Sequence, residues 1–301
     1  MADDIFIGVD GGATKSRVRI ENSAGHLLGQ GVGGPANISL SVDTSWESIY
    51  HALEEALSLT TIRLDSADYH FHLGLGLAGC EVPHAVTDFL SRQHPFSTLH
   101  LVSDAHVACV GAHQGRDGAI IVVGTGVIGY EIESGKCTRI GGWGFPHDDE
   151  GGGAWLGLEA ARLTFQWLDR RVEKSPLVED VFGFFNHDIE TFTTWANRAN
   201  STEFARLAPL VINHAQQEEV AALRLIKKAA HAVDRIGLAL MKSQKEREKH
   251  LPCSLLGGMA PFIKPWLCDE LRGCLVPRVA DAAAGAILMI RERVTSGATQ
   301  T

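Results

Sequence analysis

The sequence predicts an α/β protein with two domains of like topology, and three observations support that prediction. Apolar runs of strand length alternate with stretches of helical spacing along the chain. A strand, a glycine-rich turn and a second strand occupy residues 5–20, and the same pattern returns at residues 119–133. We interpret the repeat as an internal duplication, in which each domain presents one glycine-rich hairpin across a central cleft. A length of 301 residues also favours two cores over one.

The first hairpin carries the clearest chemical pattern. Gly11 and Gly12 allow the backbone to reverse tightly, so that several N–H groups can point at one anion. Thr14 and Lys15 add a hydroxyl donor and a positive charge. Asp10 ends the first strand, and a carboxylate beside a phosphate site makes sense mainly with a divalent cation between the two. An ordinary hairpin with an aspartate at its tip is the alternative interpretation.

The composition is typical of a soluble globular protein, with 45% hydrophobic and 21% charged residues. The formal net charge of −9 argues against nucleic acid as a partner, because binding it needs a basic face. No apolar run approaches the length of a membrane span, and the acidic N-terminus lacks the apolar core of a signal peptide. The six cysteines form no Cys-x-x-Cys pair, which indicates neither a zinc ribbon nor a disulfide scaffold and favours a cytoplasmic location.

The rest of the first half alternates strands and helices. We predict a strand after residue 25, strands over residues 70–77 and 99–103, and helices over residues 43–59, 83–92 and 105–113. Residues 31–37 are so rich in glycine that we predict an irregular loop there. Asn37 in that loop is either a polar contact for a small ligand or, more often for such an asparagine, a residue that closes a turn.

Asp104 stands between a predicted strand and a predicted helix. In open α/β sheets ligands gather outside the carboxyl ends of the strands, which gives this aspartate more weight than an average one. Aspartate is also a good helix N-cap, so a purely structural role is the alternative. The two roles are compatible.

The second half opens with the repeated hairpin, after a linker near residues 115–118. Thr125 takes the place that Thr14 has in the first hairpin. In the glycine-rich stretch 141–155, Asp148, Asp149 and Glu150 either hold a ligand, which we favour, or form a solvated loop that caps the next helix. Helices are then predicted over residues 154–167, 177–197, 201–215 and 219–250, followed by a strand and glycine turn over residues 253–259 and a final helix entered at residues 279–290.

In combination these motifs resemble the actin/hexokinase/Hsp70 superfamily. Asp10-Gly-Gly-Ala-Thr looks like its first phosphate motif, Gly124-Thr-Gly like its second, and Leu255-Leu-Gly-Gly-Met like its adenosine motif. Within it the chain is similar to the N-acetylglucosamine kinase and glucosamine kinase group, which shares a domain type with the BadF/BadG/BcrA/BcrD ATPases. The motifs that carry this likeness are Gly34-Pro-Ala-Asn, Ser103-Asp-Ala, Gly142-Trp-Gly, Asp149-Glu-Gly and Phe185-Asn-His-Asp-Ile.

The resemblance implies a fold and a reaction. The fold would be two ribonuclease-H-like domains of the actin-like ATPase type. Residues 1–116 would bind sugar and the first phosphate, residues 117–282 would bind nucleotide, and the final helix 283–301 would return to the first domain. The reaction would be phosphorylation of N-acetylglucosamine or glucosamine at the 6-hydroxyl, with ATP and Mg²⁺ as cofactors.

The roles that the resemblance implies fall on residues that match the family motifs. Asp104 would be the base and a sugar contact. The other sugar contacts would be Asn37, Gly142, Trp143, Gly144 and Asp149. The ATP contacts would be Gly11, Gly12, Thr14, Lys15, Thr125, Gly126, Gly257 and Gly258. Asp10 would lie near Mg²⁺ and bind it through water.

The chain departs from the family pattern at two places, and other functions stay open. Ala13 stands where many relatives have glycine, which slightly constrains the loop without removing a donor. His147 and Asp148 stand where relatives have small residues, directly before Asp149-Glu-Gly, so the fine sugar contacts are expected to differ. A BadF/BadG-type ATPase that activates a partner protein is the main alternative, although no cysteine lies in a glycine turn to hold an iron–sulfur cluster. A non-enzymatic sugar sensor is less favoured, because such proteins usually add a DNA-binding module. The expected partners are thus an amino sugar and ATP, with no nucleic acid and no membrane, and a homodimer is left open.

Overall fold

The structure is a computed structural model that describes residues 2–58, 60–248 and 250–297. Two compact units divide the chain. The first comprises the described residues of Met1–Gly118, Ile132–Gly135 and Pro277–Thr301, and the second those of Ala119–Glu131 and Lys136–Val276. The unit boundaries thus lie near 118 and 277, where the resemblance implied 116 and 282. Parts of the predicted segments 1–116, 43–59, 219–250 and 283–301 lie outside the described residues, namely 1, 59, 249 and 298–301.

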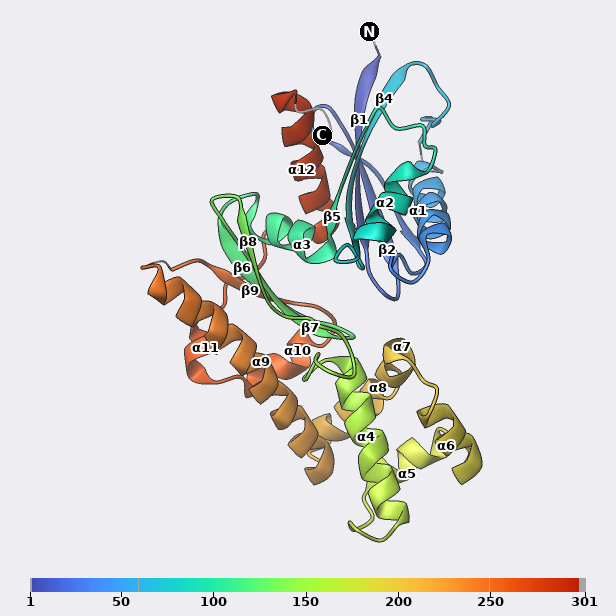
Figure 1. Ribbon diagram of the computed structural model, residues 1–301, viewed down its shortest axis with the longest axis vertical. Helices are drawn as coiled ribbons and strands as arrows, with labels where there is room; N and C mark the ends of the chain where they lie inside the picture. The colour runs from blue at the N-terminus through green and yellow to red at the C-terminus, as the bar shows by residue number, and fades with distance from the viewer. Residues whose placement is uncertain (1, 59, 249, 298–301) are drawn as a thin grey trace. The chain divides into compact units, whose positions relative to one another are not determined.

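The first unit is built on a five-stranded sheet with the order β3-β2-β1-β4-β5 (Figure 1). The strands are β1 (Asp3–Gly11), β2 (Ser16–Asn22), β3 (Leu27–Gly33), β4 (Tyr69–Leu77) and β5 (Thr98–Ser103). β1 pairs antiparallel with β2 and parallel with β4, and β4 pairs parallel with β5. The carboxyl ends of these three parallel strands therefore share one edge of the sheet, which brings Asp10 and Asp104 to the same edge.

Helices cover both faces of this sheet. They are α1 (Val42–Leu57), α2 (Pro83–Ser91), α3 (Asp104–His113) and the C-terminal α12 (Ala282–Ser296). α1 and α2 pack on one face, where their apolar residues share a core with Ile7 and Leu75, and α12 packs on the other (Figure 1). α12 comes very close to the sheet, because a Cβ on Gly8 of β1 would lie only 2.1 Å from the carbonyl oxygen of Ala283.

The prediction of an irregular loop over residues 31–37 is wrong in its first part, because β3 continues to Gly33. A Cβ on Gly31 would lie 2.0 Å from the carbonyl oxygen of Ala52, and one on Gly33 would lie 2.1 Å from that of Ser48. Both carbonyls belong to α1. These glycines therefore allow the strand to lie directly against a helix backbone, which is a packing role and not a loop signal.

The second unit contains a four-stranded sheet with the order β8-β7-β6-β9. Its strands are β6 (Gly118–Val123), β7 (Val127–Glu133), β8 (Lys136–Gly141) and β9 (Cys253–Leu256), and β6 pairs parallel with β9. This order corresponds to β3-β2-β1-β4 of the first sheet, with β6 in the place of β1 and β9 in the place of β4. The α/β class with two ribonuclease-H-like sheets is therefore confirmed.

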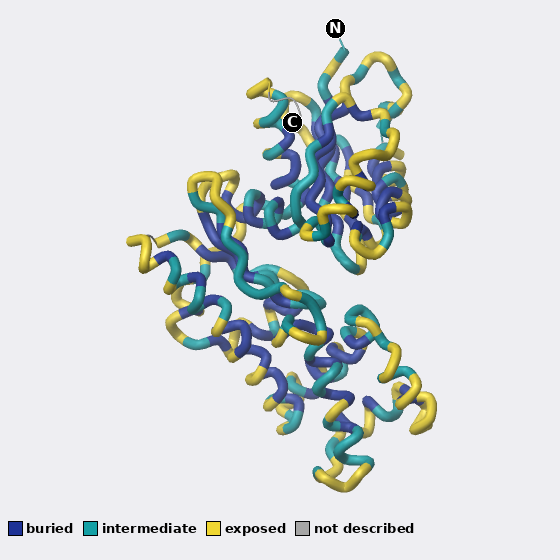
Figure 2. The backbone as a smooth tube through the Cα atoms, viewed as in Figure 1, coloured by how far each residue is buried: buried dark blue, intermediate teal, exposed yellow. Residues whose placement is uncertain are grey.

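Helices make up most of the rest of the second unit. They are α4 (Gly153–Leu168), α5 (Pro176–Gly183), α6 (Ile189–Ala196), α7 (Ser201–Ala205), α8 (Ala208–Gln216), α9 (Val220–Glu246), α10 (Ala260–Ile263), the 3₁₀ turn η1 (Lys264–Trp266) and α11 (Asp269–Cys274). Figure 2 shows buried residues concentrated in the strands of each unit and along one side of the long helices α4 and α9.

Two of the predicted helices are each two helices. The segment 177–197 breaks between α5 and α6, where Asn186 and His187 have φ values of 55° and 57°. Asp188 then starts α6 by accepting the N–H of Glu190 at 3.0 Å. The segment 201–215 breaks between α7 and α8, and Pro209 lies in the first turn of the second piece. In the segment 177–197 the apolar periodicity continued across the break, so it concealed the two left-handed residues.

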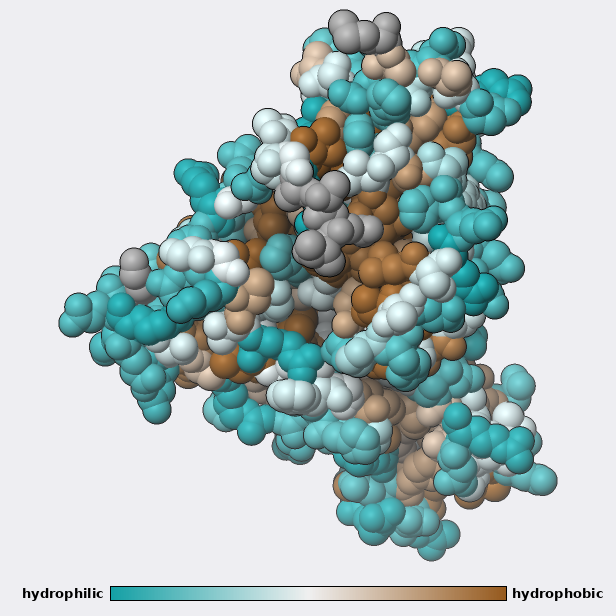
Figure 3. All heavy atoms as spheres, turned by 45° about the horizontal axis from the view of Figure 1, so that its top comes forward, coloured by the Kyte–Doolittle hydropathy of each residue, from teal (hydrophilic) through white to brown (hydrophobic). Residues whose placement is uncertain are grey.

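The surface shown in Figure 3 is mostly hydrophilic, with hydrophobic side chains reaching it in patches. Trp143 and Leu40 are among the large apolar residues that are exposed. Within the described ranges, no helix combines the length and apolarity that a membrane crossing requires.

Candidate functional site

The first glycine turn is closed by its own backbone. The N–H of Gly12 donates to the carbonyl of Lys15 at 3.0 Å, directly beyond the last strand residue, Gly11. A Cβ on Gly11 would lie 2.5 Å from Leu77 Cδ2, so a side chain would not fit on the inner side of the turn. Thr14 and Lys15 are exposed. The turn therefore leaves a hydroxyl and an ammonium group available to an anion in solution.

Asp10, the residue before the last in β1, lies beside this turn as a partly buried carboxylate. Burial raises the pKa of Asp10, and the charge of Asp281 raises it further, whereas Arg17, Lys15 and Arg278 lower it. Burial disfavours the ionised form of a carboxylate, and a nearby cation stabilises that form. No group of three or more His, Cys, Asp or Glu side chains among the described residues could hold a metal ion by itself. A cation at Asp10 would thus take most of its ligands from water and phosphate, as Mg²⁺ commonly does.

Sequence reasoning missed Asp281, which the C-terminal chain brings within electrostatic reach of Asp10. Asp281 caps α12 by accepting the N–H of Ala284 at 2.8 Å. The available signal was an aspartate directly before a run of small residues, which is a good helix start. The local pattern could indicate the cap, but only the return of α12 to the first sheet places this carboxylate near β1.

Asp104 is the first residue of α3, and the cap of that helix is its neighbour Ser103. The Oγ atom of Ser103 accepts the N–H of His106 at 3.2 Å. The Oδ1 atom of Asp104 accepts the N–H of Ala105 at 2.8 Å. The alternative role of Asp104 as the helix cap is therefore wrong, because the cap is the preceding residue, Ser103.

The environment of Asp104 suits proton transfer. Burial raises the pKa of Asp104 to about 6, the hydrogen bond from Ala105 opposes this, and the charges of Asp10 and Glu81 raise it further. A carboxylate with a pKa near neutrality can accept a proton efficiently in neutral solution. Asp10 and Asp104 are close enough to interact electrostatically, so the first unit brings the two predicted carboxylates together.

Asn37 lies at the same edge of the sheet, because it pairs with Ala78 directly after β4. Its Oδ1 atom accepts the N–H of Ser39 at 3.0 Å and the hydroxyl of Ser39 at 2.7 Å. The turn-closing role expected as the alternative is therefore present. Within the described part of the chain, the Nδ2 group makes no hydrogen bond, so its two donors are available to a ligand.

In the second unit, the glycine turn and the acidic loop are bonded to each other. The N–H of Gly124 donates to the carbonyl of Gly126 at 2.9 Å, which closes the turn. The Oδ1 atom of Asp149 accepts the N–H of Val127 at 3.1 Å. A Cβ on Gly126 would lie 2.5 Å from Asp149 Oδ2, so this glycine leaves the space that the carboxylate fills.

The start of α4 completes this assembly. The N–H groups of Gly153 and Ala154 donate to the carbonyls of Gly124 and Thr125 at 2.8 and 2.9 Å. Asp149 has a φ of 65° in the left-handed region, and burial raises its pKa. The structure thus brings together four predicted or neighbouring features of the second unit: the Thr125 turn, Gly126, Asp149 and the helix that follows.

The Gly142-Trp143-Gly144 loop is held by Asp148. The N–H of Trp143 donates to Asp148 Oδ2 at 3.0 Å, and the N–H of Asp148 donates to the carbonyl of Gly144 at 2.9 Å. Gly142 and Gly144 have φ values of 71° and 98°, which side-chain-bearing residues rarely adopt. The Asp148 carboxylate therefore has a structural role in this loop.

The third glycine turn follows β9. Gly257 has a φ of 97°, and a Cβ on it would lie 2.2 Å from the carbonyl oxygen of Val123, which also accepts the N–H of Met259 at 3.0 Å. A Cβ on Gly258 would meet nothing within 4 Å. Gly257 is thus needed for packing on β6, whereas Gly258 presents bare backbone on an open side.

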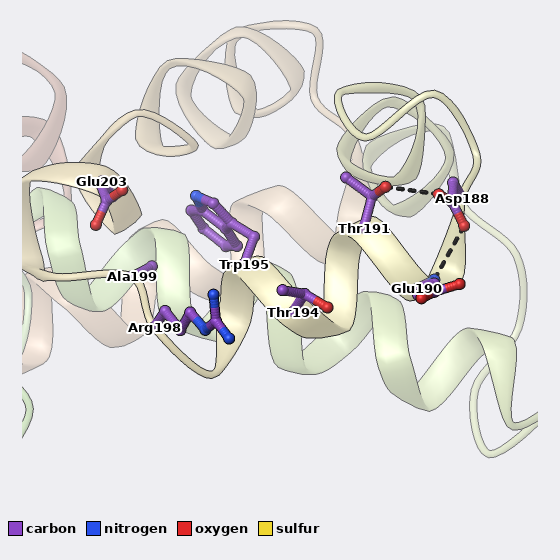
Figure 4. A pocket seen from close by; sticks show the side chains of 8 residues that line it. All are labelled: Asp188, Glu190, Thr191, Thr194, Trp195, Arg198, Ala199 and Glu203. Carbon is purple, nitrogen blue, oxygen red and sulfur yellow. Dashed lines mark hydrogen bonds between the residues drawn. The ribbon is translucent and has the colours of Figure 1, made fainter.

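A polar groove of about 490 Å³ lies on α6 and α7 in the second unit (Figure 4). Its lining residues are Asp188, Glu190, Thr191, Thr194, Trp195, Arg198, Ala199 and Glu203. Asp188 caps α6, and Glu203 belongs to the capping box of α7, so two of the three acids already serve the helices. None of the predicted site residues lines this groove.

Comparison with known proteins identifies the family. The sequence model described as the BadF/BadG/BcrA/BcrD ATPase family matches residues 7–272. The glucosamine kinase GspK of Vibrio cholerae is 33% identical over 283 residues, which cover 94% of each chain. An N-acetylmuramic acid/N-acetylglucosamine kinase of Clostridium acetobutylicum is 27% identical over 302 residues, covering 95% of this chain and 97% of that relative.

Solved structures agree with the sequence relatives. A candidate N-acetylglucosamine kinase from Chromobacterium violaceum superimposes with a TM-score of 0.87 at 35% identity, covering 95% of this chain and 98% of that chain. A ROK family glucokinase from Streptomyces griseus has a TM-score of 0.54 at 15% identity, covering 96% of this chain and 99% of that chain, which is a likeness of fold alone. The actin-like ATPase fold class is therefore confirmed, and the chain belongs to the BadF/BadG/BcrA/BcrD ATPase family.

Proposed function

We propose that this protein is an amino-sugar kinase that transfers the terminal phosphoryl group of ATP to the 6-hydroxyl of glucosamine or N-acetylglucosamine. The observation that carries the proposal is Asp104, a carboxylate with a pKa raised to about 6 at the strand edge that also holds the first glycine turn. The names of the relatives, glucosamine kinase and N-acetylglucosamine kinase, support the substrate class.

The first unit would bind the sugar and position the reaction. Asp104 would accept the proton of the attacking hydroxyl as the new oxygen–phosphorus bond forms, because a neutral hydroxyl is a poor nucleophile. The free Nδ2 donors of Asn37 would hold a second sugar hydroxyl. Gly11 and Gly12 would shape the turn, in which the Thr14 hydroxyl and the Lys15 ammonium group would bind phosphate oxygens.

The second unit would bind the nucleotide, and the family motifs that it carries also imply sugar contacts. Thr125 and Gly126 would form the second phosphate turn. The Asp149 carboxylate and the loop Gly142-Trp143-Gly144 would contact the sugar. Asp149 suits this role because the N–H of Val127 holds its carboxylate in a fixed position beside the second glycine turn.

The adenosine end would lie beyond Gly257 and Gly258. An apolar slot of about 280 Å³ in the second unit is lined by Ile212, Ala215, Gln216, Ile226, Pro261, Phe262, Pro265 and Trp266. Phe262 and Pro261 follow Gly258 closely in the chain. An apolar slot with aromatic residues in its lining suits a purine ring, which stacks on apolar and aromatic side chains. Trp266, one of the lining residues, has the Nζ atom of Lys227 4.9 Å from its ring centroid.

Mg²⁺ would be held by Asp10 through water and would offset the charge of the transferred phosphoryl group. The family is an ATPase family, which supports ATP as the phosphoryl donor. Six free cysteines and a cytosolic nucleotide substrate support a cytoplasmic location. The net charge of −9 supports the absence of a nucleic-acid partner, and a homodimer awaits measurement of the molecular mass in solution.

A coupled assay of ADP release across amino sugars tests the proposal. We expect ADP release that requires glucosamine or N-acetylglucosamine, together with a sugar 6-phosphate identified by nuclear magnetic resonance. Glucose and mannosamine are suitable comparison sugars. ADP release that is the same with and without any sugar would instead fit an ATPase that acts on a partner protein, and it would reject the kinase proposal.

A further inference from the structure

Trp143 carries a large apolar side chain that is exposed to solvent on a loop with a fixed backbone. Its residue is 74% exposed, while its backbone is fixed by the hydrogen bond to Asp148 and by the left-handed glycines on either side. The fixed backbone determines where the side chain leaves the loop but not how the indole ring is turned. An exposed indole on a fixed loop is typical of a surface that contacts a ligand.

Arg139 fixes the orientation of the Trp143 indole ring, which the backbone leaves undetermined. It lies in β8, and its Cζ atom is 4.0 Å from the centroid of the Trp143 ring. Among the described residues Arg139 has no ion pair and no hydrogen bond, so the indole face is the contact that holds its guanidinium group. A planar guanidinium stacks well on an indole, and the attraction orients both side chains.

We infer that Arg139 is a positioning residue for the amino-sugar site: it covers one face of the Trp143 indole and holds the ring so that the opposite face meets the pyranose ring. This inference rests on the proposed function. Arg139 touches neither the sugar nor the phosphates and acts through Trp143.

The charge of Arg139 also affects which sugar groups the other face of the Trp143 ring can bind. An aromatic ring attracts a cation through the negative potential of its faces, and a guanidinium on one face offsets that potential. The ammonium group of glucosamine would therefore gain little on the other face, whereas the uncharged C–H face of a pyranose ring would still bury apolar surface there. The contribution of the stack is thus expected to be the same for glucosamine and N-acetylglucosamine.

Steady-state kinetics of the full chain test the inference. Arg139→Ala should raise the KM for both sugars by a similar factor of about two to ten. The kcat and the KM for ATP should change less than twofold, and the melting temperature should stay within a degree or two of wild type. Arg139→Lys keeps the charge but loses the planar stack, and it should give an intermediate KM.

The chain offers a matched control and a double-mutant cycle. Arg206 forms a similar stack on Phe184 in the same unit, with a distance of 5.6 Å to the ring centroid, and Arg206→Ala should leave both sugar KM values unchanged. In a Trp143→Ala background, Arg139→Ala should have no further effect, because the cycle isolates the pair.

Each failure has its own result. The positioning role would be overturned if Arg139→Ala raised the sugar KM as much in the Trp143→Ala background as it does in wild type. A rise in KM for only one of the two sugars would also overturn it. So would an active Arg139→Ala enzyme whose sugar KM values are unchanged. A wild-type protein that phosphorylates no amino sugar would reject the proposed function, and the inference with it.

Discussion

Asp149 accepts the backbone N–H of Val127 at 3.1 Å across 22 positions of sequence. This hydrogen bond joins the acidic loop to the second glycine turn, so a carboxylate proposed to contact sugar and a turn proposed to bind phosphate share one framework. Burial raises the pKa of the same carboxyl, and the N–H of Val127 lowers it. A change at either element is therefore expected to be felt at the other.

Gly126→Ala should damage this framework, whereas Gly124→Ala should not. A Cβ on Gly126 would lie 2.5 Å from the Asp149 carboxylate and push it off Val127, whereas a Cβ on Gly124 would meet nothing within 4 Å. We expect Gly126→Ala to cost about 1–3 kcal/mol of unfolding free energy and to raise the KM for both ATP and sugar. Urea unfolding and steady-state kinetics of the two variants provide the check. Equal behaviour of both variants would contradict the proposed coupling.

Asp104→Asn should separate catalysis from stability. Asparagine keeps the shape of the side chain but lacks the basic oxygen, so kcat should fall by roughly 10²–10⁴-fold. The melting temperature should change little, because the cap of α3 is Ser103. Ser103→Ala is the matched variant, and it should lower stability by about 1 kcal/mol with a smaller effect on kcat. Near-normal turnover of Asp104→Asn would end the assignment of Asp104 as the base.

The pH dependence of the reaction and of stability should run in opposite directions. The ionised form of Asp104 accepts the proton, so kcat/KM for sugar should rise as the pH increases through about 6, the pKa of this carboxyl. Because that pKa is raised above the ordinary value of 3.8, the folded state favours the protonated form. The cost of ionising Asp104 in the fold is absent below pH 3.8 and complete above about pH 6, so its contribution lowers stability across that window.

Melting curves of wild type and Asp104→Asn between pH 4 and pH 7, compared as differences, isolate this contribution from the other carboxylates. The stability of wild type relative to Asp104→Asn should fall as the pH rises. A difference that is independent of pH would show that the Asp104 carboxyl titrates normally in the folded protein.

Removal of the divalent cation should abolish turnover without unfolding the protein. Asp10 is proposed to hold Mg²⁺ through water, and phosphoryl transfer needs a cation to offset phosphate charge. ADP release should therefore disappear in excess chelator and return with added Mg²⁺, while circular dichroism stays unchanged. Asp10→Asn should need more Mg²⁺ for half-maximal rate. Full turnover in chelator would refute a metal role.

The sequence by itself determined the class of fold and the identity of the turns. Strand runs such as residues 5–9 and the repeated glycine hairpins are local patterns, because the periods of strands and helices are set by neighbouring residues. The family motifs around Asp10, Thr125 and Gly257 are also local, because each consists of a few consecutive residues. The breaks near Asn186 were missed because two left-handed residues leave the hydrophobic period unchanged.

The tertiary structure alone decided which of these local elements act together. Gly31 belongs to a strand and not to a loop because α1 packs directly against it, and the helix lies more than ten residues farther along the chain. Asp281 affects Asp10 because the last helix returns to the first sheet. Asp149 is tied to the second glycine turn by a hydrogen bond that no local pattern contains. Burial and charge act through space, so the pKa of Asp104 could not be assigned until the chain had brought Asp10 and Glu81 near it.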